Sequence, residues 1–85
     1  MKEQGYQKKI SDKYTKDGYF VLNLIKTNCN GISDLLILKP NEPATFLECK
    51  TEKGKLSEIQ KYRLNTLKDM GFNTLVSYGN EITEF

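Results

Sequence analysis

A capping box near the middle of the chain constrains the fold more than any other feature. In the segment Ser57 to Gln60, a serine and a glutamine three residues apart can each satisfy an exposed backbone donor at the start of a helix. Apolar residues then recur at helical spacing up to Gly71, a residue type that often ends helices. The apolar segments on either side, residues 45–50 and 72–78, are predicted strands. Since strands joined through a helix lie parallel with a right-handed crossover, these two are expected to be parallel.

The remaining elements follow from shorter patterns. Helical spacing predicts a first helix over residues 3–16, ended by Gly18, and residues 19–25 are rich in aromatic and branched side chains typical of a strand. A second strand at residues 35–38 is separated from the third by a short turn, which indicates an antiparallel hairpin. The last residues are expected to form a polar tail. The predicted order is αβββαβ, an α/β fold with a mixed sheet flanked by helices.

Size and composition limit what this chain can be. Its 85 residues fit a single domain, residues 1–85, and such small cores often gain stability from a metal, a ligand or a second subunit. It contains no histidine and two cysteines, Cys29 and Cys49, which argues against a zinc site and against Ser-His or Cys-His catalysis. No secretory segment or long apolar run is apparent, so we expect a reduced, cytoplasmic protein without a membrane partner.

Basic residues gather in the middle of the chain, although the net charge is only +2. Such a cluster can contact nucleic-acid phosphates or form an ordinary solvated face, and composition does not distinguish the two. The members of this cluster are Lys50, Lys53, Lys55, Lys61 and Arg63.

The residues that indicate chemistry are Asp34, Glu48 and Lys50. Side chains alternate along a strand, so Glu48 and Lys50 are expected on one face of the third strand and Leu47 and Cys49 on the other. In a hairpin, Asp34 can lie across from Glu48. Two neighbouring carboxylates repel, and a hard divalent cation such as magnesium relieves that repulsion while keeping positions for water and a substrate phosphate. Lys50 could then orient or help deprotonate the attacking water, or neutralise charge on the phosphate.

A purely structural interpretation of these residues is also available. Asp34 could serve as a turn residue, and Glu48 with Lys50 could form an exposed ion pair worth at most about 1 kcal/mol. Spacing leaves both interpretations open.

A family resemblance favours the metal site. The segment Gly31-Ile-Ser-Asp34, followed by Glu48-Cys-Lys50, resembles the signature of the PD-(D/E)xK nucleases, whose core is restriction-endonuclease-like. With Glu3 and Gln7 in the first helix and the segment from Gly54 to Gln60, the pattern is similar to the virus-type replication-repair nuclease (VRR-NUC) domain. The family's proline before the motif aspartate is Ser33 here, which removes a backbone constraint and no chemical group.

The resemblance implies a role for each residue. Asp34 and Glu48 would be metal ligands, joined by the Glu3 carboxylate and the Cys49 carbonyl, while Lys50 would be the catalytic lysine and Gln60 would lie near the site. Three of these have structural alternatives. Glu3 could simply favour the positive end of a helix, Gln60 could act only as the capping partner, and the Cys49 side chain could be a core residue.

The resemblance also implies a function. We expect a magnesium-dependent DNA endonuclease, with manganese as a substitute, acting on branched DNA such as Holliday junctions, with Lys53 and Lys55 contacting DNA. Its size resembles the stand-alone, phage-type members, which would place it in the cytoplasm of a bacterial host. Alternatives are a nicking or flap nuclease of the same fold, or a non-catalytic DNA-binding module.

A two-fold homodimer is the expected assembly. Apolar residues exceed what two short helices can cover, and a closed dimer would bury the excess. The residues on which this expectation depends are Tyr6, Tyr14, Tyr19, Phe72, Tyr78, Ile82 and Phe85.

Overall fold

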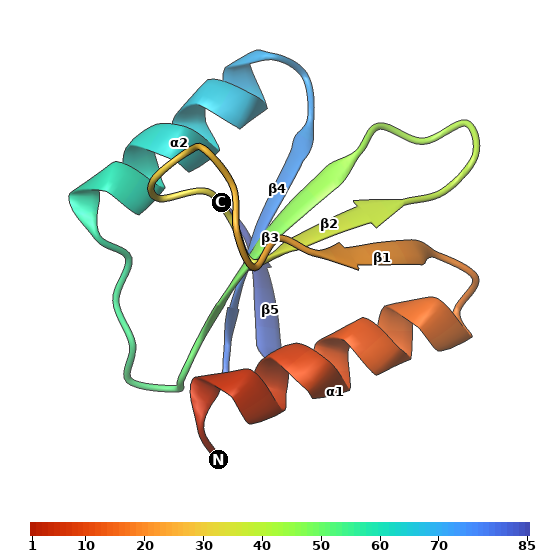
Figure 1. Cartoon of the computed structure of the whole chain (residues 1–85), viewed down its shortest axis with the longest axis horizontal. Coiled ribbons are helices and arrows are strands. Elements are labelled where there is room, and N and C mark those ends of the chain that lie inside the picture. The colour runs from red at the N-terminus through yellow and green to blue at the C-terminus, as the bar shows by residue number, and fades with distance from the viewer.

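A computed structural model describes all residues, 1–85, as a five-stranded mixed sheet with one helix on each side (Figure 1). The elements are α1 (Glu3–Lys16), β1 (Phe20–Asn23), β2 (Leu35–Leu38), β3 (Thr45–Lys50), α2 (Glu58–Asp69), β4 (Asn73–Tyr78) and β5 (Glu81–Glu84). The strands lie in the sheet in the same order as in the chain. No helix in the structure has the length and apolar character needed to cross a membrane.

The two predicted strand pairings are confirmed. β2 and β3 form an antiparallel hairpin in which Leu35 lies opposite Leu47. β3 and β4 are parallel neighbours with α2 between them in the chain, as expected for a helical crossover. β1 adds to β2 in antiparallel fashion, and it is shorter at both ends than the predicted strand 19–25.

The predicted polar tail is wrong: residues 81–84 form strand β5. This strand pairs with β4 in antiparallel fashion, with Ile82 opposite Ser77. Gly79 supplies the positive φ of 63° in the tight connection between the two strands. Only Ile82 of this strand is half-buried, and such a short polar segment gains its structure mainly from backbone pairing with β4.

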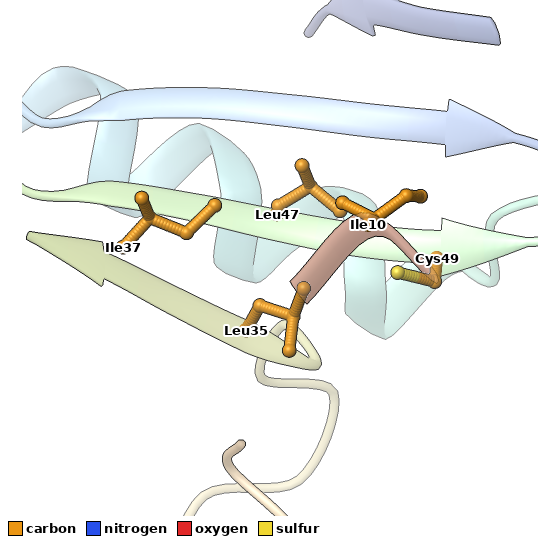
Figure 2. Close-up of a cluster of buried hydrophobic side chains, with 5 residues drawn as sticks. All are labelled: Ile10, Leu35, Ile37, Leu47 and Cys49. Atoms are coloured by element: carbon orange, nitrogen blue, oxygen red, sulfur yellow. The ribbon is translucent and has the colours of Figure 1, made fainter. Parts of the chain in front are cut away.

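The main core lies between the sheet and α1 (Figure 2). Leu47 and Cys49 of β3 point into it, as the strand alternation predicts, and both are fully buried. Ile10 of α1 packs against them, together with Leu35 and Ile37 of β2. The side chains that remain on β3 therefore face the other side of the sheet, toward α2.

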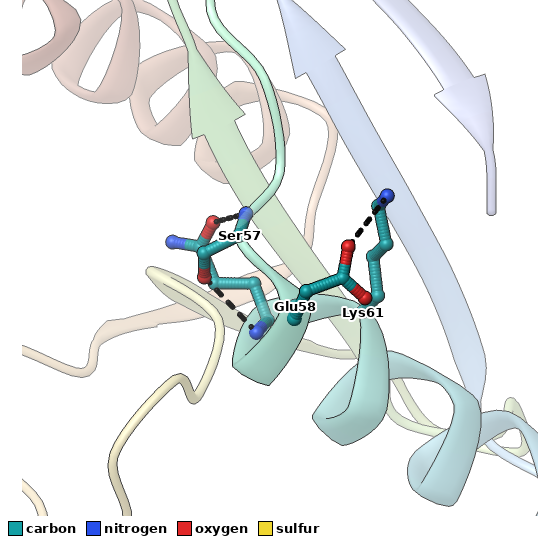
Figure 3. A network of polar contacts seen from close by, with 4 residues as sticks. Ser57, Glu58 and Lys61 are labelled. Carbon is teal, nitrogen blue, oxygen red and sulfur yellow. Dashed lines mark hydrogen bonds and ion pairs between the residues drawn. The ribbon is translucent and has the colours of Figure 1, made fainter.

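The predicted capping box is present at the start of α2 (Figure 3). The backbone N–H of Gln60 donates to the Ser57 hydroxyl at 3.2 Å, and the Ser57 N–H donates to the Gln60 side-chain oxygen at 2.9 Å. Leu64 is the buried residue of this helix. The rings of Phe46 and Phe72 meet edge to face at 5.8 Å, which adds a small aromatic contact outside the main core.

The exposed apolar surface is not where the sequence placed it. Tyr6 is buried, and the other aromatic and apolar residues expected to be in excess are all half-buried. Instead, Phe20 and Leu22 of β1 are 63% and 38% exposed, because they point to the side of the sheet where α2 packs on β4 and leaves β1 uncovered. The neighbouring Leu36 and Leu38 of β2 are half-buried.

Candidate metal centre

Three carboxylates from three separate elements meet at one end of the sheet. Glu3 comes from the first turn of α1, Asp34 from the residue before β2, and Glu48 from β3. One carboxylate oxygen of each lies within 4.8 Å of the others. The β2–β3 hairpin positions Asp34 and Glu48 next to each other, and the packing of α1 across the sheet adds Glu3.

Two backbone N–H groups from neighbouring segments donate hydrogen bonds to Asp34, one to its carbonyl and one to its side chain. Its carbonyl accepts a hydrogen bond from Leu24 N–H at 2.8 Å, which extends the β1–β2 pairing by one step. Its Oδ2 atom accepts the backbone N–H of Cys49 at 2.7 Å. Since Leu35 lies opposite Leu47, Asp34 occupies the next position along, opposite Glu48. The carboxylate is therefore oriented before any ligand binds.

Gln60 acts both as a capping residue and as a neighbour of the site. Its side-chain oxygen accepts from the Ser57 backbone, as described above, and its Nε2 donates to Glu48 Oε2 at 3.2 Å. The two interpretations of this residue offered by the sequence are compatible, because an amide carries an acceptor and a donor on separate atoms. One side chain thus links the start of α2 to the central carboxylate.

Glu48 is buried, with only 2% of its surface exposed. Burial raises the pKa of its carboxyl to about 9, and hydrogen bonding and repulsion from Asp34 act in the same direction, while the charge of Lys50 opposes them. Its Oε1 atom is buried without a hydrogen-bond partner. A buried carboxylate oxygen is rarely left without a partner, so Oε1 is available to coordinate a cation.

The donor set fits a hard divalent cation. Three carboxylates within reach of one point and one unpartnered buried oxygen are what magnesium or manganese binds, since both prefer oxygen ligands. Burial also raises the pKa of the Cys49 thiol to about 12, so its sulfur is a core group rather than a ligand. Coordination by the Cys49 carbonyl stays a prediction.

Lys50 lies at the end of β3 on the same face as Glu48, as the strand alternation predicts. The loop that follows turns back onto its side chain: a Cβ added at Gly54 would lie 2.9 Å from Lys50 Cβ. Glycine here allows the loop to support the aliphatic stem of Lys50. Lys53 and Lys55 in this loop are exposed and do not belong to the carboxylate cluster.

The loop before Asp34 is docked on α2 by residues to which sequence reasoning gave no such role. Gly31 has a φ of 78°, and a Cβ there would lie 3.0 Å from the Ile59 carbonyl oxygen. Arg63 Nε donates to the Asn30 carbonyl at 2.9 Å. Gly31 belongs to the Gly-Ile-Ser-Asp motif, so the sequence did contain a pattern that could have indicated its role. Ser33 is buried and its hydroxyl has no hydrogen-bond partner.

A comparison with protein families finds a match over most of the chain. A family model described as the VRR-NUC domain matches residues 1–81, which includes both helices, the first four strands and all three carboxylates. Comparisons with curated proteins and with solved structures find no significant match.

Proposed function

The chain belongs to the VRR-NUC domain family, which implies nuclease activity on DNA, and we propose that it is a magnesium-dependent endonuclease that cuts branched DNA such as Holliday junctions. The observation that carries the proposal is the cluster of Glu3, Asp34 and Glu48, in which one buried oxygen of Glu48 has no partner. A silent DNA-binding module has no reason to hold three carboxylates where a DNA phosphate would approach.

The proposed roles follow from the contacts of each residue. Glu3, Asp34 and Glu48 would hold the cation, which when bound supplies a Lewis acid for activating water against the phosphodiester. Gln60 keeps Glu48 oriented through its 3.2 Å hydrogen bond. The Lys50 ammonium, on the same face, places positive charge at the reacting phosphate and can hold or move a proton at the attacking water.

DNA is expected to approach over the loop that carries Lys53 and Lys55. Both side chains are exposed in the loop that directly follows Lys50, so they are free to contact phosphates of the bound DNA. Contacts of this kind fix the position of the backbone and carry little sequence information, which suits an enzyme that recognises the shape of a DNA structure.

A cleavage assay on labelled DNA tests this proposal. We expect cutting of a four-way junction in magnesium or manganese, none in chelator, and weaker cutting of linear duplex. Preference for a flap or splayed arm would favour a flap nuclease, and single nicks would favour a nicking enzyme. Binding of DNA without cleavage under every metal condition would leave a non-catalytic DNA-binding module.

The homodimer is proposed with a different surface from the one that the sequence suggested. β1 is an edge strand of sequence Phe-Val-Leu-Asn with no charged residue, whereas the other edge, β5, carries Glu81 and Glu84. Charged residues on an edge strand oppose further strand pairing, so β1 is the unprotected edge. Antiparallel pairing of β1 with β1 of a second copy is self-complementary and would cover the exposed Phe20 and Leu22.

Sedimentation at micromolar concentration tests the dimer. The wild-type protein is expected to sediment as a dimer and Leu22→Lys as a monomer, because the lysine places equal charges close together across the paired edge strands. Glu84→Lys, on the opposite edge, is the matched control and should remain dimeric. A wild-type chain that stays monomeric with and without junction DNA would contradict the dimer.

A further inference from the structure

The first turn of α1 carries Glu3 but has little that holds it locally. Its N-cap residue, Lys2, makes no side-chain cap hydrogen bond, whereas α2 begins with a complete capping box. Gly5 also lies in this turn, and glycine lowers helix stability by about 1 kcal/mol relative to alanine. Glu3 itself is exposed. A turn of this kind frays unless a tertiary contact fixes it.

Tyr6 supplies that contact. It lies one turn after Glu3, only 4% of its surface is exposed, and its hydroxyl donates a hydrogen bond to Glu52 Oε1, in the loop after β3. A buried phenol without a partner is costly, so the hydroxyl needs this acceptor. Glu52 follows the metal-centre strand by two residues. The bond therefore connects the helix that carries Glu3 to the strand that carries Glu48.

Glu52 is held in place by the turn between β4 and β5. Gly79 N–H donates to the Lys50 carbonyl at 2.8 Å, which brings this turn against the end of β3. A Cβ at Gly79 would lie 2.7 Å from Glu52 Cγ, so the absence of a side chain there makes room for the Glu52 stem. Although Glu52 is otherwise exposed, its carboxylate is directed toward Tyr6. It lies outside the carboxylate cluster and is no candidate ligand.

We propose that Tyr6 is a positioning residue whose hydrogen bond to Glu52 fixes the first turn of α1 and so places Glu3 in the carboxylate cluster. The expected effect on cation binding rests on the proposed metal site. We expect the bond to contribute to cation binding through Glu3 and not through Asp34 or Glu48, whose positions are set by the sheet.

Titration calorimetry with manganese on the full chain tests the proposal. Tyr6→Phe keeps the ring and removes the donor, and we expect it to weaken manganese binding about three- to tenfold, the scale of one lost hydrogen bond. Glu52→Ala, at an exposed position, should weaken it to the same extent. Tyr14→Phe, the same chemical change further along α1, should leave it unchanged.

A double-mutant cycle separates positioning from general stabilisation. If Tyr6 acts through Glu3, Tyr6→Phe causes no further loss of manganese affinity once Glu3→Gln is present. An equal loss in both backgrounds, or no loss in the folded single variant, would overturn the proposal.

Hydrogen exchange of the Gly5 and Tyr6 amides gives a readout that needs no metal. Both amides bond to the Lys2 carbonyl, and Tyr6→Phe should speed their exchange while Tyr14→Phe does not. Unchanged exchange would refute the anchoring role. A wild-type chain that binds no manganese would instead refute the metal site and with it the consequence for Glu3, while faster exchange in Tyr6→Phe would still show the anchor.

Discussion

Glu48→Gln is expected to lower DNA cleavage by about a thousandfold or more, which corresponds to about 4 kcal/mol of lost transition-state stabilisation. The substitution keeps the shape of the side chain and removes the negative charge at the centre of the carboxylate cluster. Asp34→Asn should have a similar effect, because its remaining side-chain oxygen can still accept the Cys49 N–H while one anionic ligand is lost. Single-turnover cleavage of a labelled junction measures both.

Glu81→Gln is the matched control, since it makes the same change at an exposed position on β5. It should cut at the wild-type rate. If Glu48→Gln also cuts at that rate with its fold intact, Glu48 is not a metal ligand and the proposed centre is wrong.

Glu48→Gln should also be more stable than the wild type when no metal is bound. The pKa of Glu48 is raised to about 9 in the folded chain, from an ordinary value near 4.5. At pH values between these two pKa values, the folded state holds one more proton than the unfolded state. The free energy of unfolding of the wild type therefore falls as pH rises through this range, by at most about 1.4 kcal/mol per pH unit. Urea unfolding in chelator should show this slope for the wild type and a weaker one for Glu48→Gln. Equal slopes would contradict it.

Lys50→Ala is the second substitution with a large expected effect. We expect the cleavage rate to fall by about a hundredfold or more, on the scale of a lost general acid–base or electrostatic group, while DNA affinity falls much less. The reason is that one ammonium acts at the reacting phosphate, whereas several other basic side chains hold the DNA backbone. Single-turnover rates at saturating enzyme, compared with DNA affinity in chelator, separate these two quantities.

Lys53→Ala is the control for this separation, because Lys53 is exposed in the loop after β3 and lies outside the carboxylate cluster. It should weaken binding and reduce the slope of affinity against salt by about 1, with little change in the saturated rate. Equal losses of rate and affinity in Lys50→Ala would make Lys50 a phosphate anchor instead.

Local patterns in the sequence were sufficient for most of the fold. The capping box at Ser57 and Gln60 predicted α2, and with it the parallel pairing of β3 and β4. The short turn after β2 predicted the hairpin, and alternation along β3 predicted that Leu47 and Cys49 face the opposite side of the sheet from Glu48. Each of these depends on residues close together in the chain, where backbone geometry leaves few choices.

The sequence also identified the three carboxylates, with Glu3 coming from family resemblance and not from spacing. Tertiary structure alone decided how they are brought together: α1 crosses the sheet so that Glu3 joins Asp34 and Glu48, and Gln60 reaches Glu48 while it caps α2. It also decided that the tail pairs as β5, that β1 is the uncovered edge, and that Tyr6 meets Glu52. These outcomes depend on contacts between residues far apart in the chain, which are set by how whole elements pack and leave no local pattern to recognise.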